Sequence, residues 1–411
     1  MDVYSLFLYL SMGAGFFMAF TLGANDVANS MAPCVGARAI TVRQALVIAS
    51  VLNFVGAVML GSHVAATMSK GIVSVELIGD PKLVMLGMFS ALLAASLWML
   101  VATLTALPVS STHSIVGAII GFGLVAGGPK AVNWLPLGGV VLSWFISPFF
   151  ALGVAYFIFT QIRRKIFLQR DFLAKAQAWG PRWMALTSVL VGFSFMYKTP
   201  FGKKLSLPWW GSALVVAAFA GLVWLIGRWY TRRLARRIAE SAEGVEQLFK
   251  NLQIFTSSYV ALSQGANDVA NAIGPIAVIY IMARDQAFVQ QADIPLWLLG
   301  LGGLGIALGI MVLGHKVMST VGEKITTLTN TRGFSVDFAA ATTVLVASKL
   351  GLPVSSTHAA VGAVTGVGLA RGFKAVDFGV LFRIVVYWVI TVPVAALTSM
   401  VLYLVLKWLF A

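Results

Sequence analysis

The chain has 411 residues, of which 59% are hydrophobic and only 10% are charged, and its formal net charge is +15. A water-soluble domain carries about 25% charged residues, so this composition excludes a soluble fold and indicates an integral membrane protein. The positive charge does not indicate nucleic-acid binding, because the basic residues cluster beside apolar runs, as in cytoplasmic loops of membrane proteins. These clusters are Arg163, Arg164, Lys165 and Arg170, then Arg228, Arg232, Arg233, Arg236 and Arg237.

Apolar runs suited to crossing a bilayer recur along the chain, since a spanning helix needs about 20 apolar residues. Residues 83–129 contain no Asp, Glu, Lys or Arg, which exceeds one span and predicts a span followed by a re-entrant or broken segment. The pattern predicts an all-α polytopic membrane protein, because the strands of a barrel would be short and alternating. The expected spans lie in residues 4–22, 42–62, 136–160, 183–197, 209–227, 251–283, 297–313, 338–348 and 378–406.

Two motifs occur twice in the same order. LGANDVANSMAP (22–33) matches QGANDVANAIGP (264–275), and LPVSSTH occurs at 107–113 and again at 352–358. Such duplication predicts two copies of one structural unit. The division is transmembrane repeat 1 over residues 1–160, basic cytoplasmic segments with a two-span hairpin over 161–245, and transmembrane repeat 2 over 246–411.

The basic clusters also set the expected orientation, because they belong in the cytoplasm. The two spans between them form a hairpin that returns to the same side, so repeat 2 starts inside. With an odd number of crossings in each copy, the two copies have inverted topology, as in secondary transporters with broken helices and a substrate site at the midplane. We therefore expect a multi-pass protein of the cell (inner) membrane with both termini outside.

Each GANDVAN segment carries one aspartate in apolar surroundings. Asp26 is the only Asp, Glu, Lys or Arg between residues 3 and 37, and Asp268 is the only one between 251 and 283. A charge at bilayer depth costs about 2.5–3.5 kcal/mol on insertion scales and marks a functional site by default. No Lys or Arg lies nearby in sequence, so the expected counter-charge is a bound cation, with a structural ion pair as the alternative.

The neighbours of these aspartates suit a cation site. Asn29 and Asn271 follow the aspartates at i+3 and share their helical face, and such oxygen ligands suit Na⁺ or a transferred proton. Helix-breaking residues flank both motifs and are expected to interrupt the helices and free backbone carbonyls, although close helix packing is the alternative for the glycines. These residues are Gly23, Pro33, Gly265 and Pro275.

The PVSSTH segments suit an anion instead. Pro108 and Pro353 are predicted in the first turn of a helix, and the Ser-Ser-Thr triplets that follow place hydroxyls beside unpaired backbone N–H groups. A buried helix N-terminus attracts anions, with ordinary capping as the alternative. His113 and His358 are interpreted either as packing residues or as proton-sensitive groups near the anion.

GANDVAN and PVSSTH, duplicated in one chain, resemble the inorganic phosphate transporter (PiT) family over both repeats. The resemblance implies a homodimeric, cation-coupled importer of inorganic phosphate, with re-entrant hairpins that begin at PVSSTH and inverted repeats. It implies phosphate ligands Ser110, Ser111, Thr112, Ser355, Ser356, Thr357, Asn25, Asn267 and Gln264, and Na⁺ ligands Asp26, Asn29, Asp268 and Asn271.

We therefore expect secondary active symport of phosphate with Na⁺ by alternating access, no organic cofactor and no enzymatic activity. Four alternatives stay open at this point. They are symport of phosphate or metal–phosphate with H⁺, transport of another oxyanion such as sulfate, a passive channel, and a membrane hydrolase. The hydrolase is disfavoured because SSTH lacks the glycines of G-x-S-x-G.

Overall fold

The computed structural model describes residues 3–61, 72–198, 202, 205–285, 294–349 and 354–410. Eight of the helices in these ranges are long and apolar enough to cross a membrane, which confirms the all-α polytopic prediction. They are α1 (Val3–Gly36), α2 (Val42–Leu60), α4 (Pro81–Leu104), α6 (Trp134–Ile162), α9 (Trp209–Ala235), α10 (Ala242–Asp285), α11 (Leu296–Leu313) and α15 (Phe378–Phe410).

The remaining helices connect these spans or pack between them. The α-helices are α5 (Ser111–Gly127), α7 (Phe172–Lys198), α12 (His315–Ser319), α13 (Asn330–Lys349) and α14 (Ser356–Leu369). Short 3₁₀ turns are η1 (Val75–Leu77), η2 (Pro129–Ala131) and η5 (Phe373–Ala375), and π-helical turns are η3 (Arg163–Phe167) and η4 (Thr320–Lys324).

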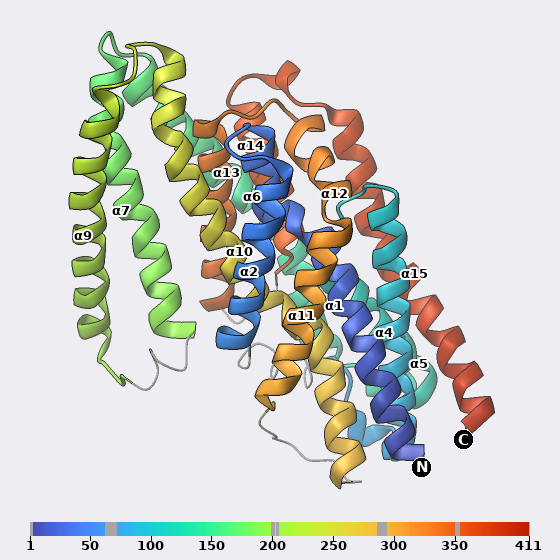
Figure 1. Ribbon diagram of the computed structural model, residues 1–411. Helices are drawn as coiled ribbons and strands as arrows, with labels where there is room; N and C mark the ends of the chain where they lie inside the picture. Colours follow the sequence, from blue (N-terminus) through green and yellow to red (C-terminus); the bar gives the residue numbers. More distant parts are fainter. Residues whose placement is uncertain are drawn as a thin grey trace.

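The segments 1–160 and 246–411, each of which carries one set of the duplicated motifs, are called the first and second copy below. Helices of one copy pack against non-equivalent helices of the other. Helix α1 packs against α11 while α2 packs against α10, and α5 packs against α15 while α14 packs against α6. Figure 1 shows α1 starting and α10 ending at the same end of the bundle, so the two helices run in opposite directions. Both chain termini lie at that end, and the loop from α9 to α10 lies at the opposite end.

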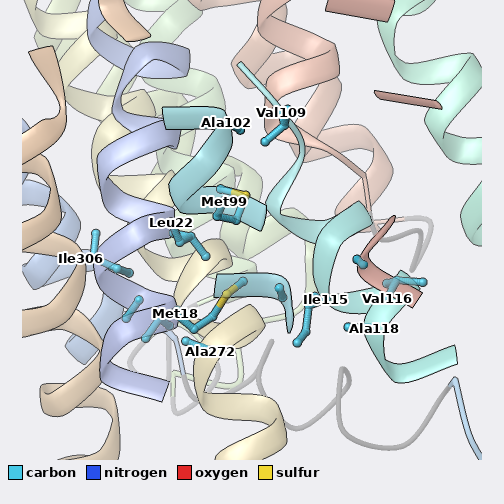
Figure 2. Packing of buried hydrophobic residues seen from close by; sticks show 14 of the residues in the cluster. Met18, Leu22, Met99, Ala102, Val109, Ile115, Val116, Ala118, Ala272 and Ile306 are labelled. Carbon is cyan, nitrogen blue, oxygen red and sulfur yellow. The ribbon is translucent and has the colours of Figure 1, made fainter. Parts of the chain in front are cut away.

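Glycines allow the closest of these helix contacts. A Cβ atom on Gly23 would lie 2.2 Å from the carbonyl oxygen of Ile306, and one on Gly265 would lie 2.1 Å from that of Asn53. Buried apolar side chains surround the close helix contacts. Met18 and Leu22 of α1 lie in one cluster with Met99 of α4, Ala272 of α10 and Ile306 of α11 (Figure 2).

The expected helix breaks at the GANDVAN motifs are wrong, because α1 and α10 are continuous through both segments. The glycines serve close packing instead. Pro33 and Pro275 lie inside the helices, and because proline has no N–H, each deprives the carbonyl four residues earlier of its helical donor. Those carbonyls belong to Asn29 and Asn271, so the freed backbone oxygens occur without a break in the helix.

The charge-free segment 83–129 forms α4 and the short helix α5, joined by a non-helical segment, as expected for a span followed by a broken one. Helix α5 begins at Ser111 with Ser110 as its N-cap. The prediction that Pro108 occupies the first helical turn is therefore wrong, because the proline lies two residues before the cap. Pro353 lies outside the described residues.

The central insert forms the antiparallel hairpin α7–α9 (Figure 1). It joins the bundle through a separate apolar cluster, in which Trp183 of α7 packs against Phe334 and Phe338 of α13. The tip of this hairpin, at residues 198–204, lies largely outside the described ranges.

Candidate functional site

The starts of α5 and α14 are buried in the middle of the bundle and are capped identically. The Ser110 hydroxyl accepts a hydrogen bond from the backbone N–H of His113 at 3.2 Å, and Ser355 accepts one from His358 at 3.3 Å. Each cap uses the N–H of the third helical residue. The first two N–H groups of each helix have no acceptor within the helix, so they remain available to an anion.

Asp26 joins the two motifs. Its side chain is 1% exposed. One carboxylate oxygen accepts a 2.6 Å hydrogen bond from the Ser111 hydroxyl, and the other accepts 3.4 Å bonds from Asn29 and Thr357. A residue of the first copy is thus bonded to the starts of α5 and α14, which belong to different copies.

The asparagines at i+3 make reciprocal contacts across the copies. Asn29 of the first copy donates to Ser356 at 3.4 Å and to Thr357 at 2.9 Å. Asn271 of the second copy donates to Ser111 at 3.3 Å. Each GANDVAN segment therefore contacts the PVSSTH segment of the other copy, which brings all four motifs into one site.

The second half of the site is more open than the first. Asp268 is 1% exposed; one of its oxygens accepts a 3.3 Å bond from Asn267, and the other has no hydrogen-bond partner among the described residues. Asp268 and Ser356 both line a small cavity that extends between α10 and α13. By contrast, the equivalent residues of the first copy, Asp26 and Ser111, are bonded directly to each other.

Three buried side-chain oxygens without a hydrogen-bond partner belong to residues around this cavity: Asn29 Oδ1, Gln264 Oε1 and one oxygen of Asp268. The cavity has a volume of about 20 Å³, enough for one water-sized particle but not for phosphate. Such an oxygen set suits a hard cation. The cavity lining consists of Asn29, Val260, Ser263, Gln264, Asn267, Asp268, Ala340, Ala341, Val344 and Ser356.

Asn25 and Asn267 occupy equivalent positions but make different contacts. The Asn25 amide donates to Thr103 and to the Leu107 carbonyl, and its oxygen accepts from the Val109 N–H, all at 3.1 Å. Asn25 thereby fixes the non-helical segment that leads into α5. Asn267 lines the cavity instead, so its amide is the more accessible of the two.

Gln264 breaks the symmetry between the copies, because the matched position in the first copy is Leu22. Its amide nitrogen donates a 2.5 Å hydrogen bond to the backbone carbonyl of Asp26. It therefore links the two GANDVAN helices directly. Thr112, also expected among the phosphate ligands, is buried beside the start of α5.

The structure also contains a buried carboxylate that the sequence analysis missed. Asp337 of α13 is 0% exposed and accepts a hydrogen bond from Ser257 of α10. Gln253, one helical turn before Ser257, is equally buried. The sequence contained a signal for this residue, because Asp337 is an isolated aspartate directly before the expected span 338–348. The criterion that singled out Asp26, a lone charge in apolar surroundings, also identifies Asp337.

In the part of the chain that the structure describes, no basic side chain forms an ion pair with Asp26 or Asp268. Among the described residues the one ion pair joins Arg284 and Asp285 near the end of α10, and no group of three or more His, Cys, Asp or Glu side chains suits a metal ion. The arrangement defines a membrane transport protein, in which helix starts suited to an anion and buried carboxylates from both sets of duplicated motifs pack together.

Comparison with known proteins identifies the family. The model of the phosphate transporter family matches residues 22–399, so the chain belongs to this family of transporters and is not an enzyme. A predicted phosphate permease of Thermococcus kodakarensis is 46% identical over 99% of both chains. An inorganic phosphate transporter of Arabidopsis thaliana chloroplasts is 38% identical over 98% of this chain and 72% of its own.

The fold agrees with that of a solved relative. A structure described as the sodium-dependent phosphate transporter is 48% identical to this chain and superposes with a TM-score of 0.91. The match covers 98% of this chain and 100% of the other. The resemblance inferred from GANDVAN and PVSSTH is therefore confirmed at the level of family and fold.

Proposed function

We propose that this protein imports inorganic phosphate by symport with Na⁺ through alternating access. The observation that carries the proposal is the convergence of both GANDVAN carboxylates and both PVSSTH helix starts on one buried site, with Asp26 bonded to residues of both copies. The sodium dependence named for the similar solved structure supports Na⁺ as the coupling ion.

The chemistry of the site explains why two ions would bind together. Phosphate and the buried carboxylates are both anionic and repel each other in a medium of low dielectric constant. A cation held between them converts this repulsion into attraction, so each ion binds well only in the presence of the other. The buried oxygens without partners on Asn29, Gln264 and Asp268 support a cation position next to the helix starts.

Residue roles follow from the two kinds of group. We assign the cation to Asp26, Asn29, Asp268 and Asn271. The phosphate ligands in this proposal are the hydroxyls and first N–H groups of α5 and α14, together with side chains that border them: Ser110, Ser111, Thr112, Ser355, Ser356, Thr357, Asn25, Asn267 and Gln264. The serine caps at 110 and 355 act mainly by holding the helix starts in place.

The difference between the two halves supports alternating access. In the first half Asp26 is bonded to Ser111, and in the second half Asp268 and Ser356 border a cavity. Exchange of these two arrangements would close one half while it opened the other. The cavity is too small for phosphate, so entry of the substrate requires such a rearrangement.

We further propose that residues 1–160 and 246–411 are inverted-topology repeats, separated by the insert 161–245. The opposite directions of α1 and α10 and the exchanged helix partners support this (Figure 1). The basic α9–α10 region lies opposite both termini, which supports a cell (inner) membrane orientation with both termini outside. A homodimer is part of the proposal on the strength of the family resemblance.

The test is uptake of labelled phosphate by proteoliposomes that contain the purified protein. We expect uptake to require an inward Na⁺ gradient and to resist a tenfold excess of sulfate. Strong competition by sulfate would assign the site to another oxyanion, uptake driven by a proton gradient alone would assign coupling to H⁺, and flux without any cation gradient would indicate a channel.

A further inference from the structure

Four buried aromatic rings form a continuous row from one copy to the other beside the helix starts, with an edge-to-face contact between the two histidines at its centre. Ring centroids lie 3.7 Å apart for Trp144 and His113, 4.4 Å for His113 and His358, and 3.8 Å for His358 and Trp388. Trp144 belongs to α6 and Trp388 to α15. Each copy therefore contributes one tryptophan–histidine pair, and the two pairs meet through their histidines.

The histidines are fixed rigidly to the helix starts. Each is the third residue of its helix, and its backbone N–H is the group bonded by the capping serine, Ser110 or Ser355. The two residues before each histidine carry the hydroxyls proposed to bind phosphate. A displacement of one histidine backbone relative to the other therefore displaces the corresponding hydroxyls with it.

Two hydrogen bonds join the copies beside this row of rings. Nδ1 of His358 lies 2.9 Å from the carbonyl oxygen of Trp144, and because a carbonyl only accepts, the imidazole nitrogen is the donor. The indole N–H of Trp388 donates to the carbonyl oxygen of Pro108 at 3.2 Å. Both donors belong to the second copy. One bond reaches α6 and the other reaches the segment before α5, and both of these acceptors belong to the first copy.

We propose that His113 and His358 are positioning residues for the phosphate site. Contact between their rings sets the distance between the starts of α5 and α14, and thus the distance between the two sets of hydroxyl and N–H groups. The inference rests on the proposed function, since it assumes that these helix starts hold phosphate. The His113 ring contacts aromatic rings, and the His358 ring contacts aromatic rings and the Trp144 carbonyl oxygen, which favours a neutral spacer over a proton-sensitive group.

The test measures KM and Vmax for phosphate at fixed, saturating Na⁺ in proteoliposomes. We expect His113→Ala and His358→Ala each to raise KM about tenfold, with Vmax within about twofold of wild type. The double variant should raise KM no further, because removal of either ring already removes their shared contact. Unchanged KM in the single variants, or about a hundredfold increase in the double variant, would overturn the proposal.

Phe122→Ala is the matched control. Phe122 is a fully buried aromatic residue of α5, the helix that contains His113, but it lies far from the start of that helix. Its ring centroid lies 6.1 Å from that of Tyr403 in α15. We expect this variant to lose thermal stability and to keep the wild-type KM. An equal rise in KM for Phe122→Ala would show that general loosening of α5 is sufficient, and the positioning role would be rejected.

Three further variants separate the role of the ring from that of its hydrogen bond, and they keep the proposal testable if the alanine variants fold poorly. His358→Asn keeps a donor near the position of Nδ1 but removes the ring, so we expect a raised KM; a wild-type KM would overturn the proposal. His113→Phe keeps a ring, so we expect a KM near that of wild type, whereas His113→Leu should raise it. Absence of phosphate uptake by the wild type would contradict the proposed function itself.

Discussion

Asp26→Asn and Asp268→Asn form a matched pair, because each removes one buried charge at the equivalent position of its copy. Their hydrogen-bond partners differ. Asp26 accepts a 2.6 Å bond from Ser111 in addition to longer ones, whereas Asp268 accepts one 3.3 Å bond from Asn267. Both variants remove the cost of burying a charge, so the difference in their stability reports the hydrogen bonds that only Asp26 accepts, of which the bond from Ser111 is the shortest.

A hydrogen bond to a charged group contributes about 1.5–3 kcal/mol. The asparagine oxygen can still accept from Ser111, and a bond between neutral groups contributes about 0.5–1.5 kcal/mol. In choline chloride, without Na⁺, we therefore expect Asp26→Asn to be less stable than Asp268→Asn by the difference between the two kinds of bond, about 1–1.5 kcal/mol. Thermal unfolding of the detergent-solubilised variants measures this difference. Equal stabilities, or lower stability of Asp268→Asn, would refute the asymmetry of the two half-sites.

Sodium adds the functional part of the same prediction. A carboxylate about 4 Å from a cation contributes roughly 4 kcal/mol at an effective dielectric constant of 20, which corresponds to about a thousandfold in affinity. Both variants should therefore lose the stabilisation by NaCl, which for wild type reaches about 2.7 kcal/mol at a hundred times Kd. Uptake of labelled phosphate should fall to background, and wild-type uptake by either variant would contradict the cation assignment.

Two comparisons test the scaffold around the site. Asn25→Ala should destabilise the protein by about 1–3 kcal/mol, because it leaves the buried Val109 N–H without an acceptor. Asn267→Ala should cost little stability. Similar unfolding temperatures of the two variants would contradict the role of Asn25 in fixing the segment before α5. Gly23→Ala should lower the stability of the protein by about 1–3 kcal/mol or more, because the added Cβ atom would overpack against a carbonyl oxygen of α11. Gly13→Ala should be tolerated, because a Cβ atom at that position has open space. Equal losses of stability in the two variants would refute the close packing at Gly23.

The sequence predicted site residues correctly where their placement carries a high free-energy cost. Asp26 and Asp268 were identifiable because an isolated charge in an apolar helix is costly, and the structure buries both at the junction of the copies. Duplication of GANDVAN and PVSSTH predicted that the motifs share one site, since repeat architectures place their sites between the copies. The reciprocal bonds from Asn29 and Asn271 agree with this.

Details that depend on tertiary context were not predictable. Gly23 reads equally well as a helix breaker or as a packing residue, and only the approach of α11 decides between them. Pro108 suits a first helical turn, but Asn25 holds the following segment extended as far as Ser110. The hydrogen bond from Gln264 to α1 depends on where α10 crosses α1, and the periodicity of the sequence does not predict that crossing.

The central claim is that cation and anion bind cooperatively in one site, and phosphate binding with and without Na⁺ tests it most directly. Calorimetric titration of the purified protein with phosphate in NaCl and in choline chloride measures the coupling. We expect phosphate affinity to rise at least tenfold in NaCl, and by linkage Na⁺ affinity should rise by the same factor when phosphate is present. Equal phosphate affinity in the two salts would contradict the shared site.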